Sequence, residues 1–157
     1  MERDVLSRMR DLLSTTRVLS LAVIVEGHAE AALLPFVAKD GFEAVHVQAS
    51  SLARHARGLT AGARVGLLVH APDTAAADPM QLSRLTVQAV VSILDKDSSQ
   101  FAAAATRFTG RFPTAGMTLS LGDFNLYELT LGRGRYVEGF ARAFNVGPQT
   151  FAGIAAL

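Results

Sequence analysis

The chain contains no cysteine among its 157 residues. Without thiols it has no disulfide bridges, no thiolate metal sites and no cysteine nucleophile. Lysine is scarce as well and occurs only at Lys39 and Lys96, so arginine supplies most of the positive charge. Arginine is the better bidentate partner for carboxylates and phosphates, although a compositional bias of the genome would produce the same excess.

Long hydrophobic runs are also missing. The longest, residues 18–25, contains Ser20 and is too short to span a bilayer. The acidic residues Glu2, Asp4 and Asp11 precede it, unlike the basic start of a signal peptide. We therefore expect a soluble cytoplasmic protein that does not associate with membranes.

Neither sign of charge dominates, because 15 basic residues stand against 14 acidic ones. This balance argues against a nucleic-acid partner, which would require a strongly basic face. The chain is 50% hydrophobic and 18% charged, a composition that supports a buried core. Its length fits one domain: an N-terminal helix within residues 1–17, a barrel over 18–146 and a tail over 147–157.

Common catalytic patterns are absent too. No serine lies in a nucleophile-elbow pattern, and no pair of carboxylates is placed for hydrolysis. The four histidines, His28, His46, His55 and His70, lack metal-ligand spacing, so we predict no metal site built from them and leave the catalytic residues unassigned. His46 and His70 alternate with apolar residues, as ordinary strand histidines do. Any catalysis would depend on a cofactor.

Hydrophobic periodicity predicts a mainly β chain with a few helices. Helical spacing covers residues 2–15, a short segment at 51–59, and 98–111, where Asp97 and Gln100 suggest a capping box. Strand patterns cover 19–26, 31–38, 43–49, 64–70, 85–94, 120–131 and 135–140, with hairpin turns at 39–41 and 132–134. Strands outnumber crossover helices, so we expect antiparallel pairing in a closed or partly closed barrel.

The segment between the third and fourth strands carries the densest polar chemistry. It holds two hydroxyls, two guanidiniums and an imidazole next to the start of a short helix: Ser50, Ser51, Arg54, Arg57 and His55. Unpaired N–H groups at a helix start, together with arginines, suit a phosphate. The alternative is a solvated helix face whose arginines form surface ion pairs.

Three motifs in order resemble the pyridoxamine 5′-phosphate oxidase-like, FMN-binding split-barrel family, and within it the haem-utilisation branch. Residues 51–59 with 64–68 resemble S-x-L-A-x-H-T-x-N-L followed by R-V-S-L-L. Residues 84–89 resemble the R-L-x-x-x-G strand. Residues 122–126 and 135–143 resemble the D-F and R-Y-V-x-G-F-G-x-A ending. The resemblance covers about residues 12–146.

This resemblance implies an antiparallel split barrel that forms a homodimer and binds FMN between its subunits. The residues that it assigns to cofactor binding are Ser50, Ser51, Arg54, His55 and Arg57, together with Arg84 at the start of the flavin-lining strand. The implied function is a small flavin-dependent oxidoreductase acting on a small-molecule substrate or electron donor.

Two alternatives remain open at this point. The first is a haem-binding or haem-utilisation protein, which the branch favours. Haem-degrading relatives use a histidine near the C-terminus as iron ligand, however, and this chain has none after His70. A haem reading would therefore take the iron ligand from His28, His46, His55 or His70. The second alternative is a non-catalytic dimeric split-barrel module.

Overall fold

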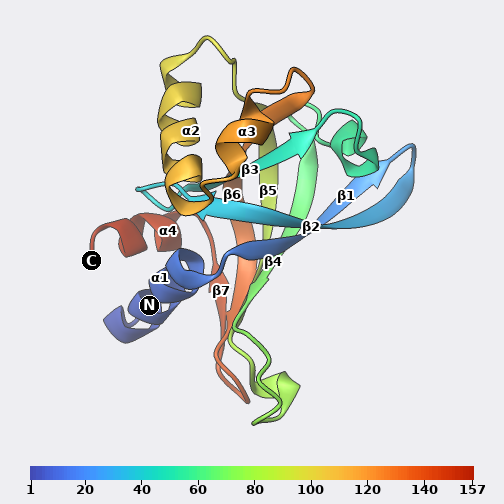
Figure 1. Ribbon diagram of the computed structural model, residues 1–157. Coiled ribbons are helices and arrows are strands. Elements are labelled where there is room, and N and C mark those ends of the chain that lie inside the picture. The colour runs from blue at the N-terminus through green and yellow to red at the C-terminus, as the bar shows by residue number, and fades with distance from the viewer.

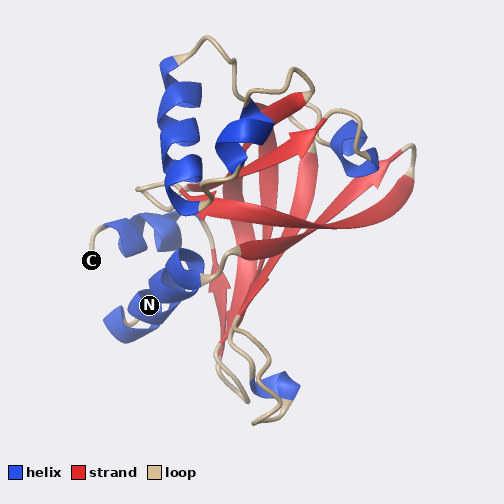
Figure 2. Ribbon diagram, viewed as in Figure 1, coloured by secondary structure: helices blue, strands red, loops and turns tan.

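Antiparallel strands make up most of the protein, and six of them close into a barrel (Figures 1 and 2). The computed structural model describes residues 1–157. The strands are β1 (Val18–Val25), β2 (His28–Ala38), β3 (Ala44–Ser50), β4 (Arg64–His70), β5 (Arg84–Ile93), β6 (Phe124–Val137) and β7 (Ala143–Val146). The helices are α1 (Arg3–Thr15), η1 (Arg54–Gly58), η2 (Pro79–Gln81), α2 (Ser99–Arg111), α3 (Ala115–Leu119) and α4 (Pro148–Ala155). The predicted antiparallel split barrel is confirmed.

The ring closes because β3 pairs with both β2 and β6. Around the barrel the strands follow the order β1, β4, β5, β6, β3, β2 and back to β1. The short strand β7 pairs with the end of β6 and stays outside the ring. Pro35 lies where β2 stops pairing with β1 and starts pairing with β3, a position that tolerates the missing N–H of proline. Closure leaves few exposed strand edges.

Alternating residues of the strands fill the barrel. On β1, for example, Leu19, Leu21, Val23 and Val25 are all buried, while the residues between them face outward. Helices α1 and α4 lie side by side and add their apolar faces to the same core (Figure 1). Helices α2 and α3 form a second, smaller core against the outer face of β2 and β6. The outer face of β1, β4 and β5 carries no helix (Figure 2).

The predicted hairpin turn at residues 132–134 is wrong. Strand β6 runs unbroken from Phe124 to Val137, and the chain reverses only after it, before β7. Both glycines of the Gly-Arg-Gly sequence allow the backbone of β6 to lie close to the backbone of β5. A Cβ on Gly134 would lie 2.2 Å from the carbonyl oxygen of Thr86, and one on Gly132 would lie 3.2 Å from that of Gln88. A register shift in β5 marks the same place.

Other expected boundaries also change. The segment 51–59 forms only the short 3₁₀ helix η1, and the tail 147–157 contains helix α4. Helix α2 is capped by Ser98, whose Oγ accepts a hydrogen bond from the N–H of Phe101, and not by Asp97. In the turn that follows β2, the residue with a positive φ is Phe42 and not Gly41. None of the helices has the length and apolar character needed to cross a membrane.

Candidate functional site

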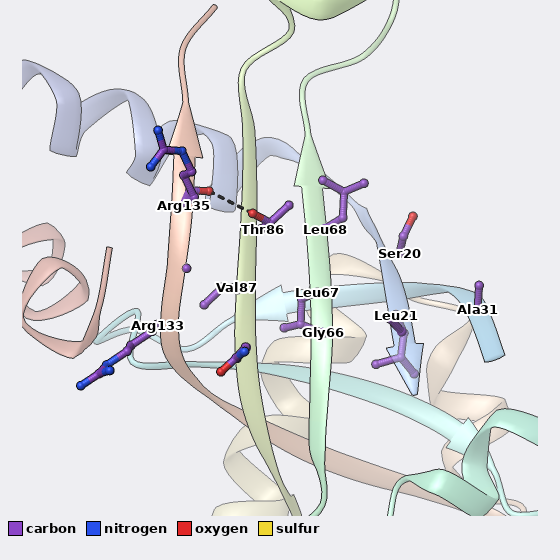
Figure 3. A pocket seen from close by; sticks show the side chains of 13 residues that line it. Ser20, Leu21, Ala31, Gly66, Leu67, Leu68, Thr86, Val87, Arg133 and Arg135 are labelled. Carbon is purple, nitrogen blue, oxygen red and sulfur yellow. Dashed lines mark hydrogen bonds between the residues drawn. The ribbon is translucent and has the colours of Figure 1, made fainter. Parts of the chain in front are cut away.

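A groove lies on the outer face of the barrel, where no helix covers the strands (Figure 3). Its volume is about 810 Å³, within the range typical of small-molecule sites. Small side chains create the space, because the outward positions include Ala22, Ala31 and Gly66. The complete lining is Ser20, Leu21, Ala22, Ala31, Gly66, Leu67, Leu68, Thr86, Val87, Gln88, Arg133, Gly134 and Arg135.

Two arginines of β6 form the basic edge of this groove. Arg133 and Arg135 flank Gly134 on the same strand, and Figure 3 shows both guanidinium groups at the side of β6 that faces away from β5. Arg135 donates a hydrogen bond from Nη1 to Oδ1 of Asn145, at 3.1 Å. Neither guanidinium has a carboxylate partner, whereas six other arginines form ion pairs with carboxylates: Arg8, Arg10, Arg54, Arg57, Arg107 and Arg142. An apolar floor with two unpaired guanidiniums suits a flat apolar ligand that carries an anionic group.

Hydroxyl and amide groups complete the polar chemistry of the groove. Thr86 donates from Oγ1 to the carbonyl oxygen of Arg135 at 3.4 Å, across the β5–β6 pair. Ser20 and Gln88 also face the cavity. A second cavity of about 730 Å³ shares Arg133 and Gly134 with the groove and continues toward the start of α4. Arg133 therefore lines both the groove and the second cavity.

The predicted segment around η1 does not belong to the lining of the groove. Helix η1 packs against the end of β1, where a Cβ on Gly58 would meet the Val23 side chain and the carbonyl oxygen of Ile24. Val23 is buried and faces the core, whereas Ala22, one residue earlier on β1, faces outward and lines the groove. The η1 segment and the groove therefore contact opposite sides of β1.

The hydroxyls of this segment have local partners. Ser50 donates from Oγ to Oδ2 of Asp123, and its Oγ accepts from the N–H of Leu52. The N–H of Ser51 donates to the carbonyl oxygen of Asp123 at 2.7 Å, while the side chain is exposed. Ser50 thereby orders the turn that leads into η1, and Ser51 offers a free hydroxyl.

The two arginines of the segment already face carboxylates on the β1–β2 hairpin. Nε of Arg54 contacts Oε1 of Glu30, and this bond raises the pKa of Arg54. Nη1 of Arg57 lies 3.6 Å from Oε1 of Glu26. Both arginines remain more than half exposed, so their ion pairs are of the weak surface kind and compete little with an incoming anion.

His55 is the least solvated polar group of the segment. Its Nε2 is enclosed and has no hydrogen-bond partner, and burial lowers the pKa of the imidazole. A neutral imidazole is therefore the prevailing form near pH 7.

Arg84 lies apart from the other predicted residues. It pairs in register with His70, at the far end of β4 from η1. Its Nη1 donates to the carbonyl oxygens of Met80 and Leu82 and so fixes the loop before β5. The structure brings five predicted residues together around η1 and places Arg84 elsewhere.

Sequence reasoning did not assign the groove. The period-two pattern of β4 and β5 already places Gly66 and Leu68 on one face with Thr86 and Gln88. Arg133 and Arg135 were missed because their segment was interpreted as a turn followed by a new strand. The signal that could have found them is the alternation of arginine with glycine across residues 132–135, which suits an unbroken strand with one small-residue face.

A buried histidine on the other side of β3 is separate from the groove. His46 is only 3% exposed, and its Nε2 lies 2.9 Å from Oε2 of Glu128, directly across the β3–β6 pair. Burial lowers the pKa of His46, and the Glu128 carboxylate opposes this effect. Lys39 lies 3.5 Å from the same carboxylate oxygen.

The closed antiparallel ring and its outer groove define the class of the protein: a split barrel of the pyridoxamine 5′-phosphate oxidase-like type. A Clostridium acetobutylicum protein of the pyridoxinephosphate oxidase family has this fold, with a TM-score of 0.70 at 12% identity over 96% of this chain and 99% of that one. A haem-binding protein of Mycobacterium smegmatis gives a TM-score of 0.84 at 24% identity. That match covers 97% of this chain but only 61% of the mycobacterial one.

Sequence similarity places the chain within this class. The haem oxygenase HutZ of Vibrio cholerae serotype O1 is 32% identical over 132 residues, which form 83% of this chain and 74% of HutZ. The crystal structure of HutZ, described there as a haem-storage protein, matches with a TM-score of 0.71 at 28% identity over 79% of this chain and 87% of that one. No model of a known protein family matches the chain. The chain belongs to the HutZ family, the haem-utilisation branch of the split barrels.

Proposed function

We propose that this protein binds haem in the outer groove and does so as a homodimer. The observation that carries the proposal is the groove itself, with an apolar floor of small residues and two unpaired arginines at its edge. Haem is a flat apolar ring with two propionates at one edge, so its shape and charge complement that arrangement. The similarity to HutZ supports the same ligand.

Arg133 and Arg135 would hold the propionates. Each unpaired guanidinium offers charge-assisted hydrogen bonds to a carboxylate without first giving up an ion pair. The backbone near Gly66 and Gly134 leaves room for the ring to approach the strands. Bound haem would supply iron-centred ligand and redox chemistry, while the protein provides orientation and exclusion of water.

The exposed face around the groove supports the dimer. Ile24, Leu33 and Val90 point outward and are 59%, 68% and 44% exposed. Exposed apolar residues on a sheet face that no helix covers are typical of a surface that binds a partner. A second copy of the chain would cover them and enclose a ligand in the groove. The homodimer and the cytoplasmic location expected from the sequence are both part of the proposal.

Haemin titration tests the ligand. We expect the wild-type protein to develop a saturable Soret band near roughly 400 nm, a property of the cofactor itself. Replacing Arg133 and Arg135 by Gln removes two charge-assisted contacts, each worth about 1.5–3 kcal/mol, so affinity should fall at least roughly a hundredfold. Arg3→Gln, an exposed change on α1, is the matched control. Equal affinity in all three proteins would contradict the proposal.

Light scattering after size exclusion tests the dimer. The wild-type protein should have twice the 16.6 kDa mass of one chain. Leu33→Arg places a charge on the face to be covered and should give a folded monomer, because Leu33 makes few contacts within its own chain. A wild-type monomer at micromolar concentration would reject this part of the proposal.

FMN is the second candidate ligand, and one observation favours it. Ser51, Arg54 and Arg57 present an exposed hydroxyl and two weakly paired guanidiniums within the short segment around η1, a set of groups that suits a phosphate. The protein would then act as a small flavin-dependent oxidoreductase. Replacing Arg54 and Arg57 by Ala should abolish FMN binding and leave haemin binding unchanged. A protein that binds neither haemin nor FMN would favour a non-catalytic dimeric module.

A further inference from the structure

One histidine shares the face of the groove. On β4, Gly66 and Leu68 point outward and line the cavity, while Val65, Leu67 and Val69 are buried. His70 is the next outward residue after Leu68 and is exposed. Alternate residues of a strand lie about 6.6–6.8 Å apart, so the imidazole is at the immediate end of the groove floor.

The other three histidines do not share this face. His46 is buried on the opposite side of the barrel, with its Nε2 engaged by Glu128. His55 lies in η1, and its Nε2 is enclosed. His28 begins β2 and has the parity of Ala32, which packs on the core, whereas Ala31 lines the groove.

The imidazole of His70 is also oriented. Its Nδ1 lies 2.7 Å from the carbonyl oxygen of Ala71. A carbonyl oxygen only accepts hydrogen bonds, so Nδ1 is the donor of this bond and Nε2 is the ring nitrogen left without a partner in it. The same arrangement, a ring N–H held by a backbone carbonyl, orients histidines that bind metals through the other nitrogen. Nε2 of His70 is therefore the atom available to a metal at the end of the groove.

We propose that His70 would supply Nε2 as a ligand to the iron of haem bound in the groove. The proposal rests on the haem-binding function proposed above and assigns its iron ligand. No rearrangement of the strands is required, because His70 is already exposed on the correct face.

The test compares three full-length proteins loaded with haemin: wild type, His70→Ala and His28→Ala. His28 is an exposed histidine off the groove face and is the matched control. Electron paramagnetic resonance and resonance Raman spectra report whether a histidine nitrogen binds the iron, independently of any enzymatic activity. Circular dichroism confirms folding, and His70→Gln provides a second variant that keeps a polar side chain of similar size.

We expect His70→Ala and His70→Gln to retain haem, because the groove and its arginines are intact, but to lose the iron–histidine signature. Added imidazole should restore that signature in His70→Ala, and His28→Ala should match the wild type. An unchanged signature in the folded His70 variants, or a wild-type complex without histidine ligation, overturns the assignment and leaves haem binding standing. A wild-type protein that takes up no haemin overturns the proposed function, and the assignment with it.

Discussion

Replacing Gly134 by Ala should destabilise the barrel through close contacts with two residues of β5. The added Cβ would lie 2.2 Å from the carbonyl oxygen of Thr86, 2.8 Å from Cα of Val87 and 2.9 Å from its Cβ. Gly134 has no positive φ, so the alanine backbone itself is unstrained. The cost therefore comes only from separating β5 and β6, and no side-chain rotation relieves a clash with backbone atoms.

The expected magnitude follows from that geometry. Overpacking of this kind typically costs about 1–3 kcal/mol, against a gain of about 0.4–1 kcal/mol from restricting the unfolded chain. For a chain of this size, each 1 kcal/mol lowers Tm by about 2–4 °C, so we expect a net loss of several degrees. Differential scanning calorimetry measures the change directly. Since Thr86 and Val87 line the groove, the same variant should also weaken ligand binding.

Gly110→Ala is the control for this experiment. Gly110 lies in α2, and nothing stands within 4 Å of its added Cβ. An alanine in a helix is favoured over glycine by about 0.5–1 kcal/mol, so this variant should be as stable as the wild type or slightly more so. If Gly134→Ala melted at or above the wild-type temperature, β5 and β6 would not approach as described, and Gly134 would belong to a turn as the sequence suggested.

Two further predictions concern α2 and the buried histidine. Ser98→Ala removes the helix cap and should cost about 0.5–2 kcal/mol in urea unfolding, while Asp97→Ala should be neutral; equal losses would contradict the assignment of the cap. Because burial lowers the pKa of His46 below the ordinary value of 6.5, the unfolded chain binds the proton more readily. The protein is therefore most stable, as far as His46 is concerned, above pH 6.5, and this part of the free energy of unfolding is lost as the pH falls below 6.5. Between about pH 5 and 7, the free energy of unfolding of His46→Gln should change less with pH than that of the wild type. The difference between the two slopes is at most about 1.4 kcal/mol per pH unit, and equal slopes would refute the prediction.

The strands were predictable where one face is buried and the pattern alternates. Strand β4 has the predicted bounds, because Val65, Leu67 and Val69 face the core and their neighbours do not. The prediction of a turn at the Gly-Arg-Gly sequence in β6 was wrong for a physical reason. Glycine favours turns, but it also permits close backbone approach, and only the position of β5 decides between the two. Helix α4 was missed because its burial depends on contact with α1, which lies far away in sequence.

The candidate site was predictable only in part. The polar segment around η1 is contiguous, so its five residues could be selected from the sequence; the structure keeps them together, and their role in binding stays a prediction. The groove draws its lining from five strands, and its character comes from small residues that leave space. A missing side chain gives no signal in a single sequence. The carboxylates that pair with Arg54 and Arg57 come from the β1–β2 hairpin and were likewise invisible before folding.

Haemin affinity after filling the groove is the most direct test of the account. Gly66 lies on the groove floor, and its added Cβ would make only an ordinary contact, 3.4 Å from Cβ of Ala22. Gly66→Leu therefore fills the groove without changing its charge, while Gly110→Leu places the same side chain in open space on α2. Loss of haemin affinity by more than roughly tenfold, which is about 1.4 kcal/mol, in Gly66→Leu alone is the predicted result. Equal dissociation constants for both variants and the wild type would show that haem does not bind in this groove.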